Sequence, residues 1–370
     1  MRGAEGTDGA RHGAAGPGDA ASATAGAPLG GDGAEGAVSG PAADGPSGRP
    51  AEIAAFLETV GWGGAERRPL AGDASARRYL RLRRGAEGAV LMDAPAASGE
   101  DVRPFLRIAG HLSGLGLSAP GILAADAAAG LVLLEDLGDG LFARLIEADP
   151  GAAPALYGAA ADMLAALHAH PPPADLPAYA GALPGDQAAL VLETYAPAPA
   201  AARADLAACV AEACARLAPG TPVLMLRDLH AENLIWLPGR AGVARVGLLD
   251  FQDAMAGHPA YDLVSLLRDA RRDVPEEVVA ATTARYLAAT GEDAEAFAAA
   301  AAALGALRQL RILGVFARLA RAGKPGYLRH MPRVWHHLQR DLARPELSGL
   351  AALVARLVPP PTPARLEALR

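Results

Sequence analysis

The most constraining feature of the sequence is a change in hydrophobic pattern near residue 138. Before it, short apolar runs of strand length alternate with turn residues. After it, long segments repeat their apolar residues at helical spacing. Short strands that follow one another pair most simply as an antiparallel sheet, and the later helices pack as a separate layer. We therefore predict a two-lobed α+β protein, with lobes at residues 51–138 and 139–370.

The first lobe is expected to contain two helices and five strands. One amphipathic helix lies at 51–62, and a second at 100–116 carries its apolar side chains on one face. That face consists of Phe105, Ile108, Ala109 and Leu112. The predicted strands are 66–72, 77–84, 88–95, 119–126 and 130–139.

The second lobe is expected to be mainly helical, with one small hairpin. Two short apolar runs, 233–238 and 244–251, interrupt the helical pattern and predict the hairpin. The predicted helices are 140–148, 152–169, 185–194, 200–217, 259–270, 275–290, 293–321, 327–342 and 346–356.

Residues 1–50 have a different composition from the rest. They hold one leucine, one valine and no aromatic residue among many Gly, Ala, Asp and Pro. Such a segment cannot bury enough apolar surface to offset chain entropy, so we predict that it is disordered. It also has no apolar signal-peptide core, so we expect no secretion signal.

Composition excludes several classes of partner. The formal net charge is −7 and no basic patch dominates, which argues against nucleic acid. No run reaches the roughly 18 apolar residues of a membrane span. The two cysteines, Cys209 and Cys214, form no disulfide framework, which favours a cytoplasmic protein. No obligate protein partner is indicated, and we expect a small-molecule substrate.

Two motifs carry the chemistry, LRDLHAEN at 226–233 and LLDFQD at 248–253. Phosphoryl transfer needs bound nucleotide, Mg²⁺ on the phosphates and a carboxylate oriented on the attacking hydroxyl. Asp228 fits the carboxylate. Asn233 and Asp250 are oxygen donors suited to Mg²⁺, which takes few protein ligands. We expect His230 either to contact the transferred phosphoryl group or to brace the loop.

The spacing of these residues matches known kinase loops. Asp228 and Asn233 have the separation found in H-R-D-L-x-x-x-N, and Asp250 stands where the D-F-G aspartate stands. A lone RDLxxxN arises easily by chance. Both motifs in this order, after a strand-rich lobe, favour a kinase.

With these motifs, the chain resembles the aminoglycoside phosphotransferase family of small-molecule kinases, which share a protein-kinase-like fold. Within that family it is most similar to the anomeric kinases for N-acetylmuramate and N-acetylglucosamine in bacterial cell-wall recycling. The family loop typically reads H-G-D-L-H-x-x-N, whereas Leu226 and Arg227 precede the aspartate here. The resemblance covers about residues 51–345. It is carried by LAGDASARRYLRL, VLMDAP, LSAPGILAAD, LLEDLGD, RDLHAENLIWLP, VGLLDFQDAMAGHPAYDLVSLLRDARRDV and LRQLRILGVFARL.

The resemblance implies ATP and Mg²⁺ as cofactors and assigns roles to residues. Asp228 is the expected catalytic base, and Asn233 and Asp250 are the expected Mg²⁺ ligands. A buried aspartate that braces the catalytic loop is expected at Asp262, with Arg227 as its partner. The loop over the ATP phosphates is expected at Gly72, Asp73, Ala74 and Ser75, and the hinge that meets adenine at Glu135, Asp136 and Leu137.

One departure concerns the phosphates. Protein kinases place a lysine on the third strand to hold them, but this strand has none and the only lysine is Lys324. Arg77 and Arg78 are the candidates to replace it, because arginine suits phosphate oxygens. The alternative is that both arginines solvate a strand edge.

Arg308 and Arg311 are the candidate acceptor-binding residues. An arginine suits an acceptor with a lactyl carboxylate, whereas the alternative is a helix face solvated by arginine. The expected activity is phosphorylation of the anomeric hydroxyl of the two N-acetyl sugars to the sugar 1-phosphate. Two other readings stay open: a kinase for an aminoglycoside, a choline-like alcohol or another sugar, and a nucleotide-binding scaffold without turnover.

Overall fold

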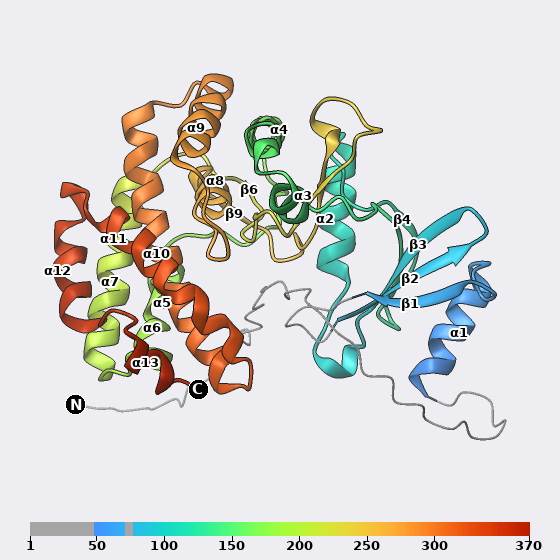
Figure 1. Ribbon diagram of the computed structural model, residues 1–370, viewed down its shortest axis with the longest axis horizontal. Helices are drawn as coiled ribbons and strands as arrows, with labels where there is room; N and C mark the ends of the chain where they lie inside the picture. Colours follow the sequence, from blue (N-terminus) through green and yellow to red (C-terminus); the bar gives the residue numbers. More distant parts are fainter. Residues whose placement is uncertain (1–47, 71–76) are drawn as a thin grey trace, which may run out of the picture.

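A computed structural model of the chain describes residues 48–70 and 77–370. It has the two lobes expected from the sequence, a sheet-containing lobe and a helical lobe (Figure 1). The sheet is antiparallel, with strand order β1-β2-β3-β5-β4. Its strands are β1 (Glu66–Leu70), β2 (Arg78–Arg84), β3 (Glu87–Asp93), β4 (Ile122–Asp126) and β5 (Leu131–Glu135).

Helices cover both faces of the sheet. α1 (Arg49–Thr59) lies on one face and α2 (Arg103–Gly114) lies on the other, between the sheet and the helical lobe (Figure 1). The α2 residues predicted to face inward are all buried, which confirms that prediction: Phe105, Ile108, Ala109 and Leu112.

The β2–β3 hairpin fixes which side chains reach each face. Its two-residue turn begins at Gly85, whose φ of 59° suits a tight hairpin turn. Alternation then sends Leu82 toward α1 and Tyr79 toward α2. Tyr79 pairs with Met92 across the strands, so Met92 shares its face. The α2 helix also borders the 248–253 motif, because the Phe105 ring stacks on Phe251 with centroids 5.0 Å apart.

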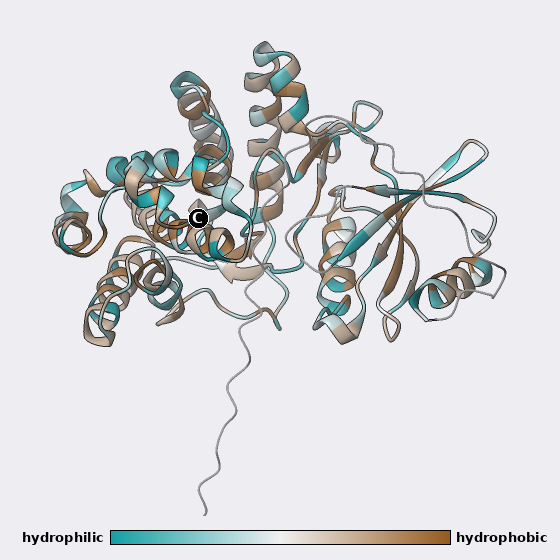
Figure 2. Cartoon of the chain, turned by 60° about the horizontal axis from the view of Figure 1, so that its bottom comes forward, coloured by the Kyte–Doolittle hydropathy of each residue, from teal (hydrophilic) through white to brown (hydrophobic). Residues whose placement is uncertain are grey.

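The helical lobe is organised around α10 (Ala294–Arg321), which packs against most of the neighbouring helices of the lobe. α10 is long and apolar enough to cross a membrane, but 94% of its apolar window is buried inside the protein, as in a core helix. Hydrophobic residues accordingly lie inside this lobe and along the strands of the sheet (Figure 2). The other helices are α3 (Phe142–Ala148), α4 (Ala153–His168), α5 (Leu183–Ala189), α6 (Val191–Thr194), α7 (Ala200–Leu217), α8 (Ala260–Leu267), α9 (Glu276–Thr290), α11 (Met331–Leu342), α12 (Ser348–Leu357) and α13 (Pro363–Glu367).

Two small two-stranded sheets flank the motifs at 226–233 and 248–253. The predicted one is confirmed: β7 (Leu234–Trp236) pairs antiparallel with β8 (Val246–Leu248). The other, β6 (Val223–Met225) with β9 (Met255–Gly257), was not predicted. Three-residue buried strands carry no alternation that sequence reading can detect.

Several boundaries differ from the predictions. The single helix predicted at 185–194 is two helices, α5 and α6, and the backbone of α10 approaches their junction closely at Gly314. The helix predicted from 327 begins only at Met331, because Pro332 lacks the amide that a continuing helix needs. The disorder predicted for 1–50 lies outside the described residues up to 47, whereas Arg49 already opens α1.

Candidate active site

The predicted catalytic loop connects β6 to β7 and contains Asp228, His230 and Asn233. The Asp228 side chain is mostly buried, with 8% of the residue exposed. The preceding residue, Arg227, has a φ of 72°, which is uncommon for a side chain with a Cβ. A strained backbone of this kind persists only where its surroundings hold it, and such positions cluster at functional sites.

Asp262 on α8 holds that strained turn in place. One of its carboxylate oxygens accepts a hydrogen bond from the Leu226 amide at 2.6 Å, and the other accepts from the Arg227 amide at 2.8 Å. Ser265, one turn further along α8, donates to the Arg227 carbonyl at 3.3 Å. The bracing aspartate expected from the sequence is therefore present. Its contact with Arg227 is made through the backbone amide.

Asn233 and Asp250 lie next to each other across the β7–β8 hairpin. The Asn233 amide nitrogen donates to the Asp228 carbonyl at 2.9 Å and to Asp250 Oδ2 at 3.4 Å. Asp250 has a φ of 58°, and Gln252 Nε2 donates to its Oδ1 at 2.6 Å. The side-chain nitrogen of Asn233 thus faces protein acceptors, so its side-chain oxygen is the atom that could bind a metal ion together with the Asp250 carboxylate. This pair of oxygen groups fits Mg²⁺.

Within this loop, the His230 side chain is buried, with 1% of the residue exposed. Its Nε2 lies 3.4 Å from the Asn233 amide nitrogen. Burial lowers the pKa of His230 to about 3, so the ring is neutral at physiological pH. Of the two roles expected from the sequence, this position supports bracing of Asn233 over contact with the phosphoryl group.

The expected nucleotide residues divide into three groups. Gly72, Asp73, Ala74 and Ser75 lie outside the described residues. Arg77 forms an ion pair with Glu100 at 2.7 Å, and both side chains are largely buried. Arg78 is 71% exposed and its Nε lies 3.6 Å from Asp93.

The predicted hinge follows β5 directly. The Glu135 amide donates to the Gly121 carbonyl at 2.8 Å, and the Glu135 carboxylate forms an ion pair with Arg240. Asp136 is held by Arg81, whose Nε lies 2.9 Å from Oδ2. Because these contacts fix both side chains and one amide, only the remaining backbone groups of the predicted hinge are free to meet an adenine.

The two candidate acceptor residues differ in exposure. Arg308 is 4% exposed, and its Nη1 has no hydrogen-bond partner among the described residues. Arg311, one turn further along α10, is half-buried. The carboxylate of Asp228 acts on the pKa of both, so both lie near the catalytic loop. Arg311 is the one that solvent reaches.

Sequence reading missed two charged contacts near the site. Glu100, which pairs with Arg77, lies in the turn before α2 and belongs to no motif. Arg49 donates to the buried Asp93 at 2.7 Å and so ties α1 to the end of β3. Each pair joins residues more than 20 positions apart, so only the fold brings them together.

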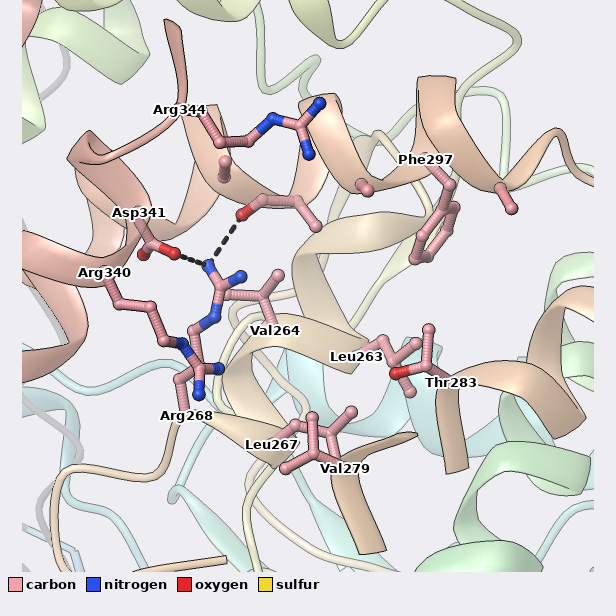
Figure 3. Close-up of a pocket in the computed structure, with 14 residues that line it drawn as sticks. Leu263, Val264, Leu267, Arg268, Val279, Thr283, Phe297, Arg340, Asp341 and Arg344 are labelled. Carbon is pink, nitrogen blue, oxygen red and sulfur yellow. Dashed lines mark hydrogen bonds and ion pairs between the residues drawn. The ribbon is translucent and has the colours of Figure 1, made fainter. Parts of the chain in front are cut away.

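A separate hollow of about 220 Å³ lies between α8, α9, α10 and α11 (Figure 3). Arg268 spans it and contacts Asp341 and the Ala301 carbonyl. The α8 residues that line it lie opposite Asp262 on the helix, so α8 braces the catalytic loop with one face and lines the hollow with the other. None of the predicted site residues lines it.

Most of the chain is similar to known phosphotransferase sequences. Residues 66–297, which include parts of both lobes and the motifs at 226–233 and 248–253, match the model of the phosphotransferase enzyme family. The chain belongs to this family. It is 46% identical over 354 residues to the N-acetylmuramate/N-acetylglucosamine kinase of Caulobacter vibrioides, covering 84% of this chain and 97% of the relative. It is 36% identical over 317 residues to the kinase of the same name from Pseudomonas aeruginosa, covering 80% and 91%.

Solved structures agree at the level of fold. A choline kinase from Streptococcus pneumoniae superposes with a TM-score of 0.56 at 15% identity, covering 82% of this chain and 99% of that one. At this identity the likeness shows the fold alone, and it confirms the predicted kinase-like architecture. The chain is thus a phosphotransferase of the kinase-like fold.

Proposed function

We propose that this phosphotransferase transfers the terminal phosphoryl group of ATP to the anomeric hydroxyl of N-acetylmuramate and N-acetylglucosamine. The observation that carries the proposal is the 46% identity to a kinase of that name over 84% of the chain. The grouping of Asp228, Asn233 and Asp250 supplies the chemistry that such a kinase needs. The product is the sugar 1-phosphate, formed in the cytoplasm during recycling of cell-wall sugars.

Asp228 acts as the base in this reaction. Its carboxylate orients the 1-hydroxyl of the sugar and takes its proton as the hydroxyl oxygen bonds to the γ-phosphorus. The bond from that phosphorus to the β–γ bridging oxygen breaks at the same time, and ADP leaves. Asp262 serves this step indirectly, because it fixes the backbone immediately before Asp228.

Asn233 and Asp250 are the residues that would hold Mg²⁺. When bound, the metal neutralises charge on the nucleotide phosphates. Gln252 supports this role by donating to Asp250 Oδ1, which fixes the carboxylate while leaving Oδ2 turned toward Asn233. His230 supports it from below, through its contact with the Asn233 amide.

Arg311 is the acceptor-binding residue that the geometry favours. It is the more accessible of the two α10 arginines and lies near Asp228. A half-buried guanidinium there suits the lactyl carboxylate of N-acetylmuramate, which N-acetylglucosamine lacks. Arg308, which is buried below the loop, is better placed to balance the charge of Asp228.

The proposal is tested by ADP release from Mg²⁺-ATP against a panel of acceptors: N-acetylmuramate, N-acetylglucosamine, glucose, kanamycin, choline and none. Phosphorus NMR of the product locates the phosphate. We expect turnover with both N-acetyl sugars and a signal from an anomeric phosphate. Turnover with kanamycin or choline alone would keep the kinase chemistry and reject the acceptor. Nucleotide binding without turnover on any acceptor would indicate a scaffold.

A further inference from the structure

The third strand offers no cation to the nucleotide phosphates. In protein kinases a lysine on this strand pairs with a glutamate and holds the phosphates. Here the inward-facing residue at the end of β3 is Met92, which is fully buried against Tyr79. The only lysine of the chain, Lys324, follows α10 in the helical lobe. Another cation must therefore meet the charge of ATP if the chain is a kinase.

Strand alternation separates Arg77, which immediately precedes β2, from Arg78, the first residue of the strand. Residues at odd positions, such as Tyr79, face α2, whereas Leu80 and Leu82 face α1. Carried back toward the strand's beginning, the same alternation places Arg77 on the α2 face and Arg78 on the α1 face. Their contacts agree, because Arg77 pairs with Glu100 just before α2 and Arg78 approaches Asp93, which is bound to Arg49 of α1.

Arg77 shares its surroundings with the proposed metal ligand. Burial lowers the pKa of Arg77, but Tyr79, Glu100 and Asp250 together outweigh it and raise the pKa. Asp250 follows β8 in the helical lobe. Since the Asp250 carboxylate contributes to the raised pKa of Arg77, the Arg77 guanidinium lies near that lobe. Arg78 is 71% exposed, and its ion-pair partner is Asp93 at the end of β3.

We propose that Arg77, held by Glu100, binds the nucleotide phosphates in place of the third-strand lysine. The arginine–glutamate pair reproduces the cation and its acidic partner on the α2 side of the cleft, with the cation moved from the third strand to the beginning of the second. Glu100 is a positioning residue, because it acts through the guanidinium that it contacts at 2.7 Å. Arg78 solvates the sheet edge. This inference rests on the proposed kinase function but not on the identity of the acceptor.

The test compares binding of ATP with binding of adenosine, which lacks phosphates, to the full-length chain by calorimetry without any acceptor. A hydrogen-bonded charge contact corresponds to about 10- to 100-fold in affinity, so Arg77→Ala should weaken ATP binding by that factor. Adenosine binding should change less than about twofold, because the hinge is untouched. Arg77→Lys should retain part of the ATP affinity, and Arg78→Ala, the matched control, should leave both ligands unchanged.

Glu100→Gln tests the positioning role. It should weaken binding of ATP but not of adenosine, and by a smaller factor than Arg77→Ala does. In the double variant the two losses of ATP affinity should not add, because both act through one contact. Additive losses would overturn the role of Glu100. The role of Arg77 would be overturned if Arg77→Ala lost affinity for ATP and adenosine equally. It would also be overturned if Arg78→Ala lost as much ATP affinity as Arg77→Ala. A wild-type chain that binds no ATP would reject the kinase function as well, whereas turnover of an unexpected acceptor would reject only the proposed substrate.

Discussion

Asp262→Ala is the substitution that most directly tests how the catalytic loop is held. The wild-type carboxylate accepts two buried backbone amides, at 2.6 Å from Leu226 and 2.8 Å from Arg227. Each buried donor left unpaired costs about 1–3 kcal/mol, which gives about 2–6 kcal/mol for two. Removal of the carboxylate also relieves the cost of burying it. We therefore expect Asp262→Ala to lower the free energy of unfolding by an amount at the lower end of this range, about 2–3 kcal/mol.

Turnover should fall as well, because Arg227 would relax from its φ of 72° and displace Asp228. A displacement of about 1 Å at a catalytic group can reduce the rate by roughly 100-fold. Urea unfolding measures the free energy and ADP release measures the rate, both at pH 8. That pH lies above the pKa of Asp262, which burial raises to about 7. Asp205→Ala, an exposed aspartate on α7, is the control and should change stability by less than about 0.5 kcal/mol. If Asp262→Ala unfolds like the control and turns over normally, the bracing argument is wrong.

Three further predictions concern catalysis, specificity and pH. Asp228→Asn should reduce kcat by about 10²- to 10⁴-fold with little change in unfolding free energy, and a variant that retains activity would exclude Asp228 as the base. Arg311→Gln should raise KM for N-acetylmuramate more than for N-acetylglucosamine, and equal changes for the two sugars would reject its contact with the lactyl group. Burial lowers the pKa of His230 from 6.5 to about 3, so the unfolded chain takes up its proton first as pH falls. The stability that neutral His230 contributes is therefore present above pH 6.5 and is lost below it. The difference in unfolding free energy between wild type and His230→Asn should narrow from pH 7.5 to pH 4.5, and a constant difference would contradict the assigned pKa.

Much of the fold followed from local pattern. The order of strands and helices in the first lobe, the inward face of α2 and the β7–β8 hairpin were all predicted, because alternation and helical spacing are properties of consecutive residues. Helix ends were less predictable. The break between α5 and α6 coincides with the close approach of α10 at Gly314, and no pattern within 185–194 shows it.

Part of the candidate site could also be predicted from local sequence. Asp228, Asn233 and Asp250 were identified from two short motifs, because the chemistry of phosphoryl transfer fixes residue type and spacing within a loop. Their assignment to catalysis remains a prediction.

The sequence by itself thus determined the kinase-like order of elements and the residues able to perform the reaction. The tertiary structure alone decided which arginine pairs with Glu100. Arg77 and Arg78 are adjacent and chemically identical, and only the packed structure brings Arg77 to Glu100 and Arg78 to Asp93. The same holds for Glu100, which becomes a partner for Arg77 because the turn before α2 folds against the beginning of β2. Register and long-range contact depend on the whole packed sheet, and neither is encoded in any single segment.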